Sequence, residues 1–223
     1  MSSPAGFRAQ SREDMLEKEP EDGYIITVVP PALCNIAIRI AGVFSRNSDE
    51  LWRSNMKVIG QQRNSRMCVI CGLDNQFGVR APFYNMTDGS VASPFRYRAW
   101  HQSYPGRVHG GMITAMLDEM GLRGLWAAKN DDTEFGVTIS LETRYRKPVP
   151  YDADLLATGK LIEDRSRLFA VEAKILTIDG EVLAEGILRY LHLPVNQISE
   201  GASVHDEMPY SPECKITELP IPV

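Results

Sequence analysis

The stretch "PGRVHGGMITAMLDEMG", Pro105 to Gly121, decides the fold, because it predicts a long apolar helix that begins at a pair of glycines. The apolar pattern continues, so we predict a helix over residues 108–129. A helix of this kind is about 30 Å long, and its apolar side chains face nearly all directions. It cannot lie on an outer face, so a sheet has to wrap around it.

Strand patterns lie on both sides of this helix. Residues 77–100 contain two strands joined at Asp88-Gly89, which is typical of a hairpin turn. Two further strands follow over 134–147 and 153–164, and residues 167–193 form a hairpin that turns at Asp179-Gly180. Two strands, one helix and four strands predict an α+β fold, a curved antiparallel β-sheet wrapped around a long central helix.

Three regions are expected along the chain. Residues 1–62 form an N-terminal extension made of a disordered arm and two helices, over 30–44 and 45–61. The wrapped-helix domain occupies 63–194. Residues 195–223 are polar and dotted with prolines, and they form an irregular C-terminal tail.

Composition excludes several classes of function. The net charge of the 223-residue chain is −5, which disfavours binding to nucleic acid. No stretch approaches the roughly 18 apolar residues of a membrane span, and no signal peptide is evident, so a cytoplasmic protein is expected. Cofactor-binding glycine motifs are lacking, and no cofactor is expected.

The chain has four cysteines, two of which, Cys68 and Cys71, form a CxxC pair. A metal site, a redox pair and a structural feature are all compatible with one such pair. A zinc site needs about four ligands, and no second pair exists. No metal site is therefore expected.

The glycine pair at the start of the helix has a chemical interpretation. Gly110 and Gly111 lack side chains, so an oxygen atom can approach their N–H groups closely. Those groups point out of a helix N-terminus, whose partial positive charge favours an oxyanion. Close packing against a strand is the alternative explanation for both glycines.

Asp118 is the second chemical feature of the helix. It lies almost two turns after Gly111 on the same face, and a carboxylate there is costly to bury without a partner. It suits a general base, although a structural carboxylate bonded to backbone or to a basic residue is the alternative. Glu119 is rotated about 100° away and is expected to be solvated or at an interface. Met112, Met116 and Met120 are expected to be ordinary core.

The spacing of these features has a consequence for assembly. Gly110 and Asp118 are about 12 Å apart along one helix. A base and an oxyanion donor that serve one carbonyl must both lie within about 3 Å of the reacting atoms. One helix cannot supply both, but two antiparallel copies can. If both features are functional, the protein is a two-fold dimer with two sites at its interface.

Together, "GRVHGGMITAMLDEMG", "GVTISLETRYRKPVPYDADLLATGKL" and the final hairpin resemble the hotdog-fold thioesterases of the phenylacetate-degradation type. The resemblance covers about residues 68–193. "CVICGLDNQFGVR" is also similar to a lead-in found in one branch of that group. The resemblance implies that the substrate is an acyl-coenzyme A or acyl-carrier thioester and that the protein is a homodimer or homotetramer.

The resemblance also assigns roles by position. Gly110 polarises the thioester carbonyl, and Asp118 acts as general base or nucleophile. Thr138 positions water or the carboxylate, and His109 is expected to cap its own turn. Gln102 is the nearest candidate for an upstream amide, although strict counting falls on Ser103. Substrate-binding positions are Gly111, Thr114, Arg146 and Lys147, with Arg144, Arg165 and Arg167 as further candidates to meet the nucleotide phosphates.

Two other functions are compatible with these residues. A non-catalytic acyl-thioester-binding or structural hotdog protein would keep the fold without turnover. A hotdog hydratase or dehydratase would need an Asp–His pair, and Asp118 lacks a His at matching helix spacing.

Overall fold

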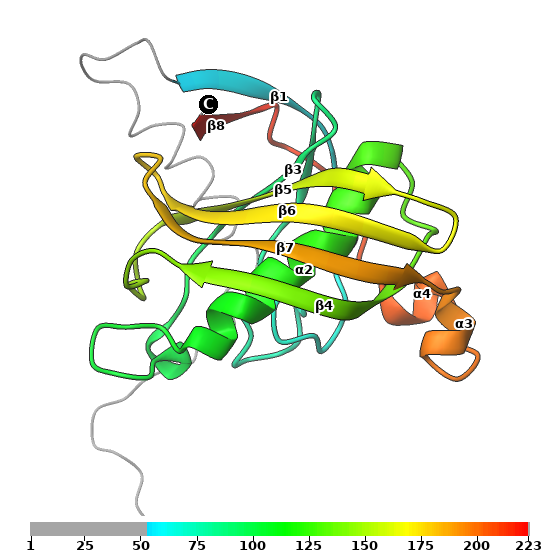
Figure 1. The fold of residues 1–223 in the computed structure, drawn as a ribbon, viewed down its shortest axis with the longest axis horizontal. Coiled ribbons are helices and arrows are strands. Elements are labelled where there is room, and N and C mark those ends of the chain that lie inside the picture. Colours follow the sequence, from blue (N-terminus) through cyan, green and yellow to red (C-terminus); the bar gives the residue numbers. More distant parts are fainter. Residues whose placement is uncertain (1–52, 223) are drawn as a thin grey trace, which may run out of the picture. The chain divides into compact units, whose positions relative to one another are not determined.

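The computed structural model describes residues 53–222, and the arm and first helix expected before residue 53 lie outside this range. The described chain forms an eight-stranded antiparallel sheet and one long helix, and Figure 1 shows the strands curving around that helix. The elements are β1 (Arg53–Gln61), β2 (Tyr84–Met86), β3 (Val91–Phe95), η1 (Ala99–His101), α2 (Gly110–Lys129), β4 (Gly136–Tyr145), β5 (Leu155–Asp164), β6 (Leu168–Thr177), β7 (Val182–His192), α3 (Val195–Ile198), α4 (Val204–Glu207) and β8 (Glu218–Pro222).

The predicted α+β architecture, an antiparallel sheet around a central helix, is confirmed. The strand order is β4-β7-β6-β5-β3-β2-β1-β8, so β5, β6 and β7 are antiparallel neighbours as expected. The helix α2 packs mainly against β5 and β6. Met116, Leu117 and Met120 are fully buried, which confirms the methionines as core. Among residues 53–222, no helix combines the length and the apolar character needed to cross a bilayer.

The helix predicted over 45–61 is wrong where the structure describes it, because Arg53–Gln61 is strand β1. This strand pairs with β2 on one side and β8 on the other. Met56 and Val58 alternate with exposed neighbours and pack against a small apolar cluster that includes Leu219. Tertiary pairing therefore overrides the local helical pattern, which came largely from polar residues before residue 53.

The C-terminal tail is more ordered than predicted. It contains two one-turn helices, α3 and α4, and the strand β8. Leu219 is buried and lies opposite Met56 in the β1–β8 ladder. Strands β1 and β8 both lie outside the predicted domain of 63–194, and they extend its sheet.

Candidate active site

The start of α2 is closed by a histidine cap. The Nδ1 atom of His109 accepts a hydrogen bond of 2.9 Å from the Gly111 N–H, so one of the two predicted oxyanion donors is already satisfied. The N–H groups of Met112 and Ile113 donate to the His109 carbonyl. Among the described residues, the Gly110 N–H has no partner. The helix therefore offers Gly110, not Gly111, to an external oxygen atom.

A tyrosine from the end of β4 lies over this helix start. The Tyr145 hydroxyl donates to the Gly110 carbonyl at 3.1 Å and lies 2.6 Å from the Thr114 hydroxyl. Tyr145 is 53% exposed, so its ring also forms part of the surface beside the helix. Sequence patterns do not single out this residue, because its role depends on how β4 packs beside α2.

Asp118 is held by two hydroxyl groups. Thr138 donates to its Oδ1 atom at 2.8 Å, and Tyr190 donates to the same atom at 3.0 Å. Thr138 and Tyr190 are directly opposite each other in the β4–β7 ladder, next to a bulge at Ile139. Oδ2 of Asp118 has no hydrogen-bond partner within residues 53–222. One oxygen thus fixes the carboxylate and the other is available to a water molecule.

Tyr190 was not predicted as a site residue. Its hydroxyl also lies 2.8 Å from the Asp118 carbonyl oxygen, which ties β7 to the middle of the helix. Burial, followed by the negative charge of Asp118, raises the pKa of Tyr190 above its usual value. The hydroxyl therefore stays protonated at neutral pH and remains a hydrogen-bond donor to the carboxylate.

Gly121 makes this contact sterically possible. A Cβ atom at this position would collide with the Tyr190 hydroxyl and ring. We expect Gly121→Ala to displace Tyr190 from Asp118 and to lower the free energy of unfolding by about 1–3 kcal/mol, as overpacking does. Chemical denaturation measures this change.

Gly124→Ala is the matched control for that substitution. It gives the same helix the same methyl group, which would meet the two Val171 methyl groups at 3.0 and 3.3 Å and the Gly159 backbone at 3.6 Å, all farther away than the Tyr190 atoms at Gly121. Both substitutions gain the same helix propensity, so a difference in stability reports the contact with Tyr190. An equal effect of the two substitutions would contradict the role assigned to Gly121.

Gln102, Arg146 and Lys147 lie at the glycine end of α2. The predicted phosphate contacts Arg165 and Arg167 instead lie near His192 at the opposite end of the helix, which ends at Lys129. Gln102 pairs through its backbone with Val108, and its side chain is exposed. Arg146 and Lys147 follow Tyr145 directly, and both are already ion-paired, to Glu185 at 3.0 Å and to Glu181. The structure therefore places the predicted residues in two groups on one helix, with Gly110 in the first and Asp118 with Thr138 in the second.

Residues 105–184 match the family model described as the thioesterase superfamily. This stretch of the chain is similar to the thioesterase superfamily. The match spans α2 and strands β4 to β6 in full, so both groups of the site except Tyr190 and Gln102 fall within it.

Two known proteins illustrate this similarity. The mouse protein named acyl-coenzyme A thioesterase THEM4 is 29% identical over 103 residues, which are 46% of this chain and 43% of the mouse protein. The chain thus spans less than half the length of that relative. The second is a thioesterase superfamily protein whose crystal structure matches this fold with a TM-score of 0.50. The two sequences are 25% identical, and the match covers 72% of this chain and 79% of the other.

Proposed function

We propose that the protein hydrolyses acyl thioesters, with Asp118 as general base. The arrangement of Asp118 carries this proposal: Thr138 and Tyr190 hold one carboxylate oxygen, and the other has no partner among the described residues. Such a carboxylate is oriented before substrate binds, as a catalytic base requires. The thioesterase-superfamily match of residues 105–184 supports the reaction class.

The proposed reaction needs only water as the second substrate. Asp118 takes a proton from water while the oxygen attacks the thioester carbonyl. The negative charge that develops on the carbonyl oxygen is stabilised by the Gly110 N–H at the positive end of a helix dipole. Collapse of this intermediate breaks the carbon–sulfur bond, and the leaving thiolate takes up the proton from Asp118. The products are a carboxylic acid and a thiol.

In the proposal, the Asp118 carboxylate and the Gly110 N–H that act on one substrate belong to different subunits, because about 12 Å separates them along one helix. Strand β4 supports a homodimer. It lies at one end of the sheet order and pairs only with β7 within residues 53–222. An unpaired strand edge favours association with another strand, and a second β4 would place two α2 helices antiparallel behind a continuous sheet.

The surface of β4 also favours this assembly. Its apolar side chains Ile139, Leu141 and Tyr145 are 54%, 40% and 53% exposed. Exposed apolar side chains on an open edge are a common sign of a protein–protein interface. Thr138, which holds Asp118, lies on the same strand, so the proposed interface passes directly beside the carboxylate.

A charge on this edge should prevent dimer formation. We expect Leu141→Lys to shift the protein from dimer to monomer and to abolish hydrolysis, because an unpaired lysine opposes strand addition. Sedimentation velocity measures the mass of the particle in solution. For comparison, Lys174→Leu changes a residue on β6, an interior strand away from the β4 edge. A fully active Leu141→Lys monomer would contradict shared sites.

The substrate proposed is an acyl-coenzyme A, in line with the name of the mouse relative. Arg146 and Lys147 lie at the glycine end of α2, where the nucleotide phosphates would be met. Their existing pairs with Glu185 and Glu181 are exposed and therefore weak, so phosphates can compete for them. The phenylacetate-degradation subtype and the cytoplasmic location remain predictions.

No histidine hydrogen-bonds Asp118 within the described chain, so the Asp–His pair of a hydratase is not supported.

A panel of acyl-coenzyme A and acyl-carrier thioesters tests the proposal, with released thiol measured by a colorimetric reagent. We expect turnover of at least one member well above the rate in buffer. Binding without thiol release across the whole panel would favour the non-catalytic alternative.

A further inference from the structure

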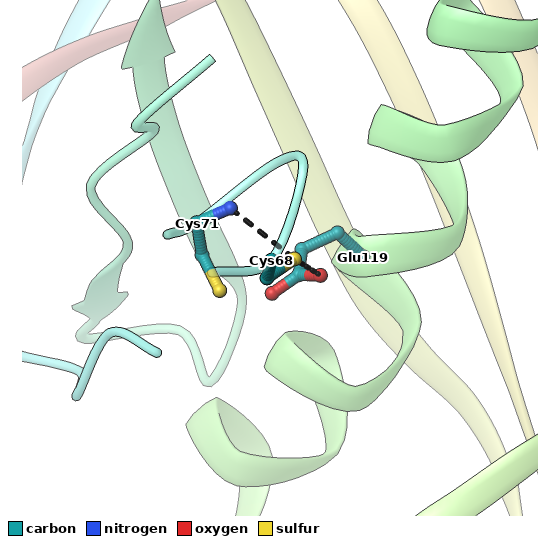
Figure 2. Close-up of side chains that lie close together, drawn as sticks. All are labelled: Cys68, Cys71 and Glu119. Carbon is teal, nitrogen blue, oxygen red and sulfur yellow. Dashed lines mark hydrogen bonds between the residues drawn. The ribbon is translucent and has the colours of Figure 1, made fainter. Parts of the chain in front are cut away.

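Cys68 and Cys71 meet Glu119 at the side of α2 (Figure 2). The two sulfur atoms and a carboxylate oxygen lie within 4.8 Å of one another, and the Cys68 sulfur is 3.5 Å from Oε2 of Glu119. Cys71 is 1% exposed, and the Glu119 side chain is 18% exposed. The prediction that Glu119 is a solvated or interface residue is therefore wrong. It faces the CxxC turn and not the surface.

The CxxC turn is built to stabilise the Cys68 sulfur as a thiolate. The backbone N–H groups of Ile70 and Cys71 point at the Cys68 sulfur, at 3.3 and 3.5 Å. Gly72 closes the turn by donating its N–H to the Cys68 carbonyl at 2.9 Å. A side chain at Gly72 would collide with the Cys68 backbone, so the turn requires glycine. Hydrogen bonds to a coordinating atom are typical supports of metal ligands.

The distance between the Cys68 sulfur and the Glu119 carboxylate fits two ligands of one tetrahedral zinc ion. Zinc lies about 2.3 Å from a cysteine sulfur and about 2.1 Å from a carboxylate oxygen, which puts these two ligand atoms about 3.6 Å apart. The observed separation between Cys68 and Glu119 is 3.5 Å. Thiolate ligands select zinc over the hard cations magnesium and calcium. Three protein ligands leave the fourth position to a water molecule.

Charge also favours a dication at this position. Arg123 is fully buried and forms a two-point ion pair with Oε1 of Glu119, at 2.9 and 2.8 Å. Its guanidinium also lies over the Phe83 ring at 4.3 Å and donates to the Arg63 carbonyl at 2.6 Å. Arg123 therefore neutralises Glu119, and it directs the other carboxylate oxygen toward Cys68.

When metal binding removes the protons of both thiols, the two thiolates together with Glu119 and Arg123 carry a net charge of −2. One zinc ion brings the buried group to neutrality, which removes the cost of burying uncompensated charge. A reactive redox cysteine is instead favoured by cationic surroundings, whereas the charged group in contact with the Cys68 sulfur is the Glu119 carboxylate at 3.5 Å, and Arg123 lies behind that carboxylate.

We propose that Cys68, Cys71 and Glu119 bind one zinc ion. The ion links the long connection of residues 62–83, which contains neither helix nor strand, to the middle of α2. Connections of this length inside a domain usually need an anchor or have a function. Glu119 is the neighbour of Asp118, so the ion holds the helix at the level of the proposed base. The site was missed in the sequence because its third ligand lies 48 positions after the second along the chain.

The first test measures metal in the full-length wild-type protein. After reduction, incubation with zinc chloride and gel filtration, mass spectrometry of the elements is expected to find about one zinc per chain. Cobalt in place of zinc should give the intense near-ultraviolet band of thiolate-to-cobalt charge transfer, and zinc X-ray absorption should show two sulfur ligands. Absence of retained zinc, or a cobalt spectrum without that band, would overturn the proposal, and neither result depends on a variant's folding.

Variants then assign the ligands. The double substitution Cys68→Ser with Cys71→Ser should lose the zinc, and Glu119→Gln should weaken zinc binding by about 10-fold or more. Cys214→Ser is the matched control, since Cys214 is a half-buried thiol outside the cluster, bonded to the Ile216 carbonyl. Full zinc content in the double variant would assign the metal elsewhere and refute the site.

Two further outcomes are informative. Asp118→Asn should retain zinc, so loss of hydrolysis and loss of metal are separable, and the zinc site can fail while the proposed hydrolysis holds. If the reduced protein forms a Cys68–Cys71 disulfide with glutathione disulfide even in the presence of excess zinc, the pair is a redox pair. That result would overturn the zinc proposal.

Discussion

Asp118→Asn is expected to lower kcat for thioester hydrolysis by about 10³-fold, because the base that accepts the proton from water is lost. Asparagine has nearly the same shape, and its amide oxygen can accept the same hydrogen bonds from Thr138 and Tyr190. The geometry around α2 should therefore persist, and the effect should fall on kcat and not on the oligomeric mass. Steady-state kinetics with a thioester that the wild type cleaves measures this loss.

The control for this variant is its structure. Thermal unfolding and sedimentation should match those of the wild type within small differences. Thr138→Ala supplies a graded comparison, because it removes one of two donors to Oδ1 and leaves the carboxylate in place. We expect a smaller loss than in Asp118→Asn. Wild-type turnover by Asp118→Asn would show that Asp118 is not the base.

Gly110→Pro should lower kcat by about 10²–10³-fold, the usual effect of removing one oxyanion donor. Proline deletes the N–H of Gly110 and nothing else that α2 needs, because the first helical position has no partner for that group within the helix. His109, the preceding residue, has φ −64° and ψ 134°, an extended conformation that is compatible with a following proline. The helix and its cap should both remain.

Gly110→Ala is the matched control for the proline substitution. It keeps the N–H, and its methyl group would lie 3.5 Å from the Tyr145 hydroxyl, an ordinary contact. Kinetics on both variants should show a much smaller loss for alanine than for proline. If alanine and proline reduce kcat equally, the space at Gly110 is what matters, and the oxyanion role is wrong.

Mixing the two inactive variants tests the shared site. If Asp118 of one subunit serves the same substrate as Gly110 of its partner, a mixed dimer of Asp118→Asn and Gly110→Pro has one intact site and one doubly altered site. Random exchange of subunits should restore about a quarter of the wild-type activity. No recovery after verified exchange would place both groups of each site in one chain.

Local patterns in the sequence predicted most of the fold. The central helix, the strands of residues 134–147, 153–164 and 167–193, and both hairpin turns are confirmed. Gly89 and Gly180 have φ of 77° and 88°, the left-handed region that such turns require. These features depend on residues that are close in sequence, so periodicity and turn chemistry are sufficient to find them.

Prediction failed where distant segments decide the structure. Arg53–Gln61 is a strand because β2 and β8 lie on either side of it, and β8 is at the other end of the chain. Tyr190 contacts Asp118 only because β7 pairs with β4 in the observed register. Hydrophobic periodicity specifies which face of an element is buried, but not which distant element covers it.

The sequence by itself determined the long wrapped helix, the antiparallel sheet and the positions of Gly110 and Asp118 on one helix face. Helical geometry converts that spacing into a distance, and the distance predicts a site shared between two subunits. The tertiary structure alone decided that His109 satisfies Gly111, that Tyr190 and Thr138 hold Asp118, and that Glu119 meets the CxxC turn. The physical reason is that these contacts join segments far apart in the chain, whose meeting depends on strand order, register and packing together.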